Sequence, residues 1–471
     1  MSVPTGTRIG FAASGTASGL VSNGISYFLL LYYSQVLGLD AALAGLAMML
    51  SLMVDAVSDP LVGRWSDRLR HRLGRRHPFL YVSIIPISLA YYFIWAPPEL
   101  GQTGLFFYLL GLAITLRFAV TLHVVPFNAL LPELTKDYDE RTQLMNFSYS
   151  AAWFFGTVMA VAMYAYWLAD APGESYGSGI FRVEGYIEAG FFSAVIIFFC
   201  LSLAAWVTHK HISELSAPPP PSGSMRDGFA ESMTTLNDAN FKAIVASGLF
   251  SAAAGGSSTA LWAYMQPYFW GFDSDQTSAI LFAQLLSAVL ALVLIPLISF
   301  GRDKKPVLIG ISIVALLVGS GPVLLSLLGL FPERGTEQLF YTMVFFGVIQ
   351  VMLIVMTSVL TISMLADVVE ARAVATDRRE EGLLFSVNSF IGKVATGVGV
   401  WMGGLLLTIV AFPTDTLAEA VSPEAIDRLG WAYGPALAVF YVLSILALRF
   451  YHLDRAQHQR LVDPDGSCTT S

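Results

Sequence analysis

The chain is poor in charged residues. Only 13% of its 471 residues are Asp, Glu, Lys or Arg, whereas 55% are hydrophobic and the mean hydropathy is +0.64. A soluble globular domain has about twice that share of charged residues. The composition therefore excludes a soluble protein of this size and predicts an all-α polytopic membrane protein.

Cysteine and catalytic motifs are also scarce. Cys200, in an apolar segment, and Cys468, in the polar C-terminal segment, do not suggest a disulfide. We find no phosphate-binding loop, no His-Glu-x-x-His motif, no zinc-ligand spacing and no nucleophile beside a base, so we do not expect an enzyme. The net charge of −8 argues against a nucleic-acid partner. The N-terminal residues lack a small-residue cleavage site, and we expect no cleaved signal peptide.

Twelve apolar segments are long enough to cross the ~30 Å of bilayer hydrocarbon. They form two sets of six, at 9–37, 41–63, 78–97, 104–131, 144–168 and 186–209, and at 241–270, 276–300, 306–330, 337–366, 382–411 and 431–451. We predict a six-helix half at 1–209, a cytoplasmic linker at 210–240, a second six-helix half at 241–452 and a cytoplasmic tail at 453–471. Repeated halves are the architecture of alternating-access carriers.

The distribution of Lys and Arg predicts the orientation in the membrane. With both termini inside, 21 of the 26 basic residues fall on the inner side, three fall outside, and Arg117 and Lys393 lie within spans. Cytoplasmic loops retain positive charge during insertion. We therefore expect a multi-pass protein of the cell (inner) membrane with both termini in the cytoplasm.

Small-residue motifs predict close helix packing in the first and eleventh spans. Gly15 and Gly19 form one Gly-x-x-x-Gly motif, and Gly399 and Gly403 form another. Such motifs let two backbones approach each other.

The most informative stretch is Met53-Val-Asp55-Ala-Val-Ser-Asp59-Pro60 in the second span. Residues four apart share one helix face, so Asp55 and Asp59 point the same way. Each ionised acid at bilayer depth costs about 3 kcal/mol on insertion scales, and the two repel each other. Static ion pairs inside the bundle would offset this cost, and so would a bound cation or proton. A cation that loads here and leaves elsewhere would make the chain a cation-coupled carrier.

Three further polar residues lie deep within spans. Lys393 is too far from its span's end for easy snorkelling, and we expect it to face the acids as a coupling residue or a static partner. Arg117 lies one turn before Thr121; it can bind an anionic substrate group or pair with an acid. For the lone His123, a hydrogen bond to a neighbouring helix is the commoner role.

The motif Asp-x-x-x-Asp-Pro-x-x-Gly, followed by Ser-Asp-Arg and Gly-Arg-Arg-x-Pro, resembles the glycoside-pentoside-hexuronide:cation symporters of the major facilitator superfamily, which include the melibiose permease. The resemblance covers essentially the whole chain. It extends to Tyr32-Tyr33, Gly38-Leu39, Pro126-Phe127, Leu131-Pro132 and Phe385-Ser386-Val387 with Lys393.

This resemblance implies the roles of several residues. The cation site would consist of Asp55, Asp59 and Thr121, with Ser58 where relatives often have Asn. The two acids would hold Na⁺ if the chain is sodium-coupled, since Na⁺ favours such oxygen ligands. Lys393 would link the cation site to the substrate site. The loop after the second span would make gating contacts between the halves through Asp67, Arg68, Arg75 and Arg76.

The chain departs from its relatives where galactoside carriers hold the sugar. Positions aligned with their sugar-binding acids are Gly19 and Val124, and an aromatic and an arginine are replaced by Asn128 and Tyr149. Galactoside recognition is therefore not expected. The remaining candidates for substrate contact are polar and aromatic residues of the predicted cavity, namely Arg117, Asn23, Tyr27, Asn128, Tyr149, Trp153, Gln266 and Asn388, together with Trp262 and Gln350.

We expect a monomeric, twelve-helix carrier with the major facilitator fold, which imports a small glycoside, sugar acid or related polar solute by symport with Na⁺ or H⁺. The expected partners are this small molecule and the lipid bilayer, with no cofactor besides the coupling ion. The alternatives are a lysophospholipid or amphiphile symporter and a non-transporting membrane sensor with the same fold.

Overall fold

The computed structural model describes residues 4–135, 137–170, 178–210, 212, 238–376, 381–414, 416–417, 420–453, 455 and 457. The chain forms two compact units. Unit 1 comprises Met1–Ser222, Thr259–Phe282 and Val400–Ile426, and unit 2 comprises Gly223–Ser258, Ala283–Gly399 and Asp427–Ser471. Nearly all of the predicted linker and tail lies outside the described residues, and the division into halves stays a prediction.

The described residues form helices and no strands, as predicted. Eleven helices are long and apolar enough to cross a membrane, and α1 with its continuation to Val36 is a further long helical segment. The elements are α1 Thr5–Gly24, η1 Ile25–Leu29, η2 Tyr32–Val36, α2 Ala41–Arg68, α3 His77–Trp95, α4 Gln102–Asn128, α5 Leu131–Leu134, α6 Tyr138–Ala162, η3 Met163–Trp167, η4 Gly179–Phe181, α7 Val183–His209, α9 Ala239–Tyr264, η6 Met265–Trp270, α10 Ser274–Ser299, α11 Lys304–Leu327, α12 Glu337–Thr376, α13 Glu381–Ile409, α14 Pro423–Ala447 and η8 Leu448–Phe450.

Two helices extend well beyond the apolar segments that predicted them. Helix α2 continues to Arg68 and α12 continues to Thr376, whereas the apolar segments end near residues 63 and 366. Charged side chains end an apolar run without disfavouring helix, because Arg and Glu have high helix propensity. The Ser66-Asp67-Arg68 motif is therefore the last turn of α2.

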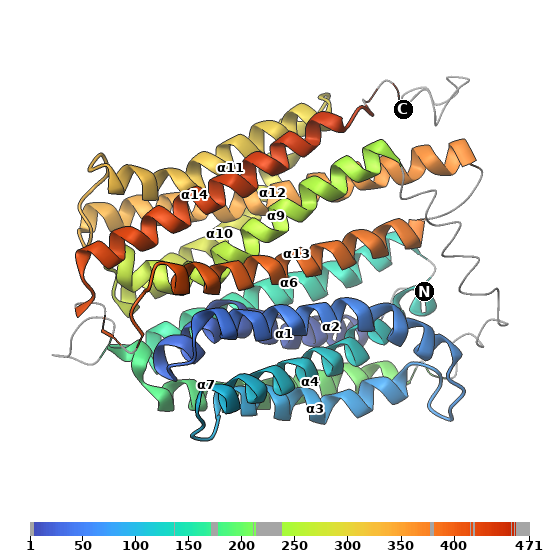
Figure 1. The fold of residues 1–471 in the computed structure, drawn as a ribbon. Helices are drawn as coiled ribbons and strands as arrows, with labels where there is room; N and C mark the ends of the chain where they lie inside the picture. Colours follow the sequence, from blue (N-terminus) through green and yellow to red (C-terminus); the bar gives the residue numbers. More distant parts are fainter. Residues whose placement is uncertain are drawn as a thin grey trace. The chain divides into compact units, whose positions relative to one another are not determined.

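Unit 1 contains the helices that carry the acid pair. Helix α1 packs against α6 and α7, α3 packs against α4 and α7, and α2 packs against α4, as can be followed in Figure 1. Asp40 begins α2 as an N-cap, since its carboxylate accepts a hydrogen bond of 3.1 Å from the Leu43 backbone N–H. The contact between α2 and α4 brings the acids of α2 beside the polar residues of α4.

Glycines let helix backbones touch, as the small-residue motifs predict. A Cβ atom on Gly15 would lie 2.0 Å from the Ser148 carbonyl oxygen, and one on Gly19 would lie 2.1 Å from that of Ala152. In unit 2, a Cβ on Gly399 would lie 2.1 Å from the Ala253 carbonyl oxygen. These contacts are too close for any other residue.

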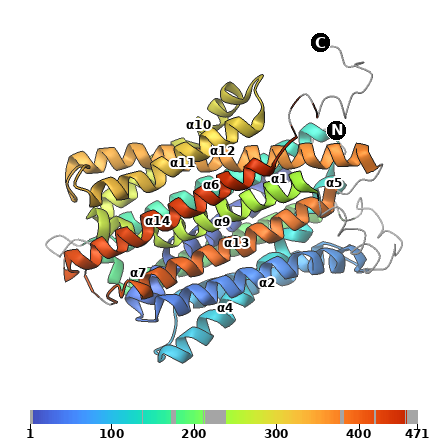
Figure 2. The same ribbon diagram turned by 45° about the horizontal axis from the view of Figure 1, so that its top comes forward.

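Unit 2 has its own apolar core, formed by parts of α9 to α14. Fully buried members include Ile244 of α9, Leu308 of α11 and Met364 of α12. Helices α11 and α12 run side by side (Figure 2). Near one end of this unit, Lys304 Nζ lies 2.7 Å from the Asp367 carboxylate, and Arg372 lies 3.6 Å from Asp238.

We predict that Gly15→Val lowers stability by about 1–3 kcal/mol, because the added atoms overlap the Ser148 carbonyl and force α1 away from α6. The measurement is the thermal transition of the purified protein. Gly111→Val is the matched control, since a Cβ on this α4 glycine meets nothing within 4 Å. Equal transitions for the two variants would contradict the close packing of α1 on α6.

Candidate functional site

The two acids of α2 share one hydroxyl of α4. Thr121 Oγ1 lies 2.8 Å from Asp55 Oδ1 and 3.1 Å from Asp59 Oδ1. Ser58 Oγ completes the group, 3.2 Å from Thr121 Oγ1. Asp55 is only 6% exposed, Ser58 5% and Thr121 1%. The four residues expected to form a cation site are therefore in mutual contact.

The number of hydroxyl protons in this oxygen cluster indicates what it can bind. A threonine hydroxyl has one proton, so Thr121 can donate to only one of the two carboxylates at a time. Ser58 supplies one further proton, and it also lies 3.0 Å from the backbone carbonyl of Asp55. The other carboxylate contact of Thr121 is favourable when an acid is protonated or when a cation lies between the oxygens. Carboxylate and hydroxyl oxygens are ligands that suit Na⁺ as well as a proton.

The helix backbone changes next to the acids. Pro60 lies inside α2, directly after Asp59. Because proline has no N–H, it cannot donate to the carbonyl of Ala56 one turn earlier. The main chain thus adds local polarity beside the carboxylates.

Arg117 of α4 adds a positive charge to the surroundings of the acids. It is half-buried, it lies one helical turn before Thr121, and it is close enough to Asp55 for an electrostatic attraction. Lys393, in α13, is also half-buried but belongs to unit 2, and its coupling role stays a prediction.

His123 joins three helices, in agreement with its interpretation as a packing residue. Its ring nitrogens lie 3.5 Å from Ser14 Oγ of α1 and 3.3 Å from Ser83 Oγ of α3. The ring also stacks on Phe127, with the ring centroids 5.6 Å apart. At 1% exposure it is part of the packed interior of unit 1.

An aromatic group in unit 1 contains two of the residues predicted to contact substrate. Tyr27 and Trp262 meet edge to face with their ring centroids 5.4 Å apart, and Tyr164 lies 6.1 Å from Trp262. Phe28 packs 5.1 Å from Tyr164. Sequence reasoning missed Tyr164 and Phe28, because aromatic residues near span ends usually mark the membrane interface.

Two residues of the aromatic group and the substrate candidate Gln266 lie in π-helical turns. Tyr27 is in η1, Tyr164 in η3 and Gln266 in η6. Such wide turns are rare and occur frequently at functional sites. The regular periodicity of the apolar segments gave no signal for them.

Several buried polar atoms of unit 1 have no hydrogen-bond partner among the described residues. They include the indole Nε1 of Trp153, the hydroxyl of Tyr164 and the side-chain oxygen of Gln266. A buried polar group without a partner costs about 1–3 kcal/mol. A polar solute that supplies the complementary groups would recover this cost.

The other candidates for substrate contact are divided between the two units. Asn23 is half-buried, and its amide nitrogen lies against Gly156 of α6. Asn128 is exposed at the end of α4, and Tyr149 is 67% exposed. Asn388 and Gln350 belong to unit 2, where they lie beside Gly248 and Gly319.

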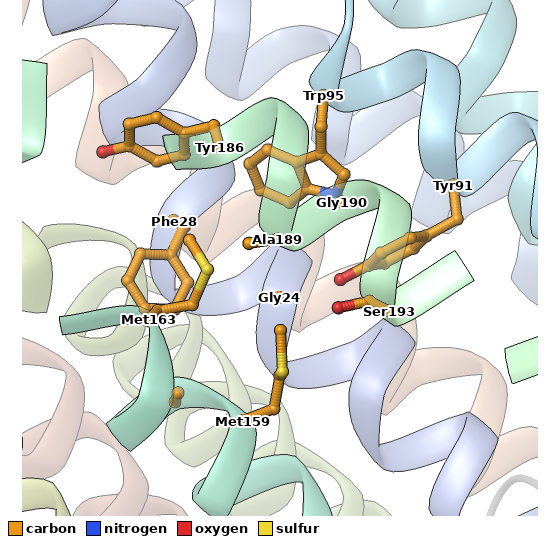
Figure 3. Close-up of a pocket in the computed structure, with 11 residues that line it drawn as sticks. Gly24, Phe28, Tyr91, Trp95, Met159, Met163, Tyr186, Ala189, Gly190 and Ser193 are labelled. Carbon is orange, nitrogen blue, oxygen red and sulfur yellow. The ribbon is translucent and has the colours of Figure 1, made fainter. Parts of the chain in front are cut away.

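A small cavity lies among α1, α3, α6 and α7 (Figure 3). Its volume is about 10 Å³, and Phe28, Tyr91, Trp95, Met163 and Tyr186 are among the side chains around it. This is room for about one water molecule. The cavity is therefore too small for a sugar-sized solute.

Part of the arginine-rich loop forms an ion-pair cluster inside unit 1. Arg76 lies 2.6 Å from Asp67, and Arg75 lies 2.6 Å from Glu133 of α5. Arg76 also donates to Ser66 Oγ at 2.6 Å and lies 3.4 Å from Glu133. Arg68 is exposed. Glu133 was not among the predicted gating residues, and a contact of this loop with the second half stays a prediction.

Polar contacts also join η2 to later segments at the opposite end of unit 1. Ser34 hydrogen-bonds the Tyr264 hydroxyl, and Tyr268 lies 3.3 Å from the Gln35 side-chain oxygen. The Gln35 amide donates to the Pro413 backbone carbonyl at 3.1 Å. The Tyr268 hydroxyl donates to the Thr416 backbone carbonyl at 3.1 Å. Residues from the first and last thirds of the sequence are thus hydrogen-bonded to each other at this end.

Comparison with known proteins identifies the family. The MFS/sugar transport protein family matches residues 10–455. An uncharacterised symporter of Synechocystis is 24% identical, with 96% of this chain and 95% of the relative covered. A putative glycoside/cation symporter of Escherichia coli is 23% identical over 96% of this chain and 92% of its own length.

The fold agrees with this relationship. The crystal structure of a D-xylose-proton symporter superposes with a TM-score of 0.65 at 14% identity, covering 94% of this chain and 97% of the symporter. The chain belongs to the MFS/sugar transport protein family: it is a multi-pass membrane transporter of the symporter type, and not an enzyme.

Proposed function

We propose that this transporter carries a small glycoside, sugar acid or related polar solute together with Na⁺ or H⁺, and that Asp55, Asp59, Thr121 and Ser58 bind the coupling ion. The observation that carries the proposal is the position of one Thr121 hydroxyl between two carboxylates. The name of the Escherichia coli relative, a putative glycoside/cation symporter, supports both the substrate class and the coupling to a cation.

Coupling follows from the charge of this site. Asp55 and Asp59 place two carboxylates in a region that, in this proposal, closes around the substrate during each cycle. An unneutralised buried charge is expensive, so closure without the cation is disfavoured. A bound cation removes that cost, and the cation and the solute therefore cross together.

The aromatic group is the proposed place for the solute. Sugar-sized ligands bind in sites that combine apolar faces with a few fixed polar groups. Tyr27, Trp262 and Tyr164 supply the faces. The unpartnered atoms of Trp153, Tyr164 and Gln266 supply donors and an acceptor for hydroxyl groups. Arg117 is close enough to Asp55 to interact with it electrostatically, and it can pair with an acid or bind an anionic group of the solute.

The contacts of Gln35 and Tyr268 fit a carrier that is closed at one end of unit 1. In the orientation predicted from the basic residues, this end is the outer one, because the arginine-rich loop lies at the other. Opening toward the outside would break these hydrogen bonds.

The test is uptake by proteoliposomes of neutral sugars, uronates and lysophospholipids, each with a Na⁺ gradient, a pH gradient or neither. We expect one class of sugar or sugar acid to accumulate only with a gradient. Asp59→Asn should abolish accumulation while the variant remains folded. Gradient-independent uptake that Asp59→Asn leaves unchanged would refute the coupling mechanism, and uptake of lysophospholipids alone would refute the substrate class.

We predict that Thr121→Val raises the half-saturating concentration of the coupling cation about five- to thirtyfold. The variant keeps the side-chain shape but loses one oxygen ligand, worth about 1–2 kcal/mol. Thr121→Ser keeps the hydroxyl and should stay near the parent. The measurement is the initial uptake rate as a function of cation concentration. Equal cation affinities of the Val and Ser variants would remove Thr121 from the site.

We predict that Trp153→Phe raises the KM for the solute about threefold or more and leaves the cation dependence unchanged. The substitution keeps the aromatic face and removes the unpartnered indole N–H. Tyr166→Phe, at a residue that is 72% exposed, is the control and should leave KM unchanged. A parental KM in the Trp153 variant would show that this indole does not bind the solute.

A further inference from the structure

A second binding feature lies in unit 2, whereas the acid pair and the aromatic group belong to unit 1. It is a groove with a volume of about 760 Å³, bounded by the end of α10, the first half of α11 and the middle of α12. The loop residues Gly301, Arg302 and Asp303 form its polar end. The rest of its wall is apolar, with Val307, Val314, Leu353 and Met356 among the lining residues.

The groove has the length of one bilayer leaflet. Its lining residues on α11 run from the N-cap Asp303 to Val314, which is roughly 16 Å at 1.5 Å per residue. This is about half of the ~30 Å hydrocarbon core. A molecule that fills it would have a polar group at the loop and an apolar chain that reaches toward the bilayer centre.

The charges at the polar end distinguish Arg302 from its neighbours. Lys304 is paired with Asp367 at 2.7 Å, and Lys305 Nζ donates to the Tyr451 carbonyl at 2.6 Å. The Asp303 carboxylate accepts the Arg455 backbone N–H at 3.1 Å. Arg302 is exposed, and among the described residues its guanidinium has no ion-pair partner. A guanidinium at a membrane surface is well suited to bind a phosphate group.

We propose that this groove binds an anionic phospholipid. Arg302 contacts the lipid phosphate, and one acyl chain lies along α11 against Val314, Leu353 and Met356. The predicted orientation places the loop in the cytoplasmic leaflet, where basic side chains attract anionic lipids. This site is independent of the coupling ion and of the transported solute.

Gly310 offers a direct way to fill the groove without disturbing the protein. It lines the groove, and a Cβ added to it meets nothing within 4 Å. Gly321 lies on the same helix, also has open space at its Cβ, and does not line the groove. Gly310→Leu and Gly321→Leu therefore form a matched pair in which only the first occupies the place of the acyl chain.

The test uses the purified full-length protein in detergent, with phosphatidylglycerol, phosphatidylcholine or inorganic phosphate added. Retained lipid is counted by native mass spectrometry, and the shift of the thermal transition is measured against lipid concentration. We expect phosphatidylglycerol to bind and stabilise the parent and Gly321→Leu. Gly310→Leu should lose this binding. Arg302→Gln should weaken it about tenfold, and Arg302→Lys should restore part of it.

Each alternative outcome would overturn the proposal. Binding that persists in Gly310→Leu would place the lipid elsewhere. Equal effects of phosphatidylcholine and phosphatidylglycerol, or an unchanged affinity in Arg302→Gln, would remove the recognition of an anionic headgroup. An equal stabilisation by inorganic phosphate would show that the acyl chain plays no part.

Discussion

The proposed cation site depends on one hydrogen-bonding constraint: a single threonine hydroxyl contacts two carboxylates. Thr121 of α4 lies within 3.1 Å of both Asp55 and Asp59 of α2. Two acids on one helix face repel each other, and their charge is costly away from water. The contact between α2 and α4 therefore matters beyond packing, since it holds a polar group against the acids and fixes the distance between them.

The rest of unit 1 provides the rigidity that such a site requires. Glycines at positions 15 and 19 bring the α1 backbone onto α6, and His123 ties α4 to α1 and α3. An oxygen cluster selects a cation by the placement of its ligands. A ligand on a loosely packed helix would adjust its position to each ion and would not discriminate among ions. In the proposed cation site, the contacts of His123 hold α4 and its Thr121 in place without contacting the ion.

Much of the fold and the core of the site could be predicted from the sequence. Apolar segments of membrane length predicted the helices, and the i, i+4 spacing of Asp55 and Asp59 predicted their shared face. Placing Thr121 beside them required the family resemblance, because no local pattern connects residues more than sixty positions apart. The partners Glu133 and Tyr164 were missed, since an acid in a short loop and an aromatic near a span end look ordinary in a linear sequence. The candidates Asn128 and Tyr149 are exposed. Sequence reasoning did not predict this, because an alignment indicates where a residue lies along a helix more reliably than whether its side chain is buried.

The π-helical turns have a consequence for how this sequence tolerates insertions and deletions. Each wide turn holds an extra residue, and each residue of a helix rotates the chain by about 100°. Tyr32 and Tyr33 follow the turn Ile25–Leu29, and they donate to the carbonyls of Trp95 and Ile94 at 3.0 and 2.9 Å. Loss of one residue from that turn would leave a continuous, equally apolar helix in which both tyrosines face a different direction. The register of the first helix is therefore set by a local irregularity that hydropathy cannot detect.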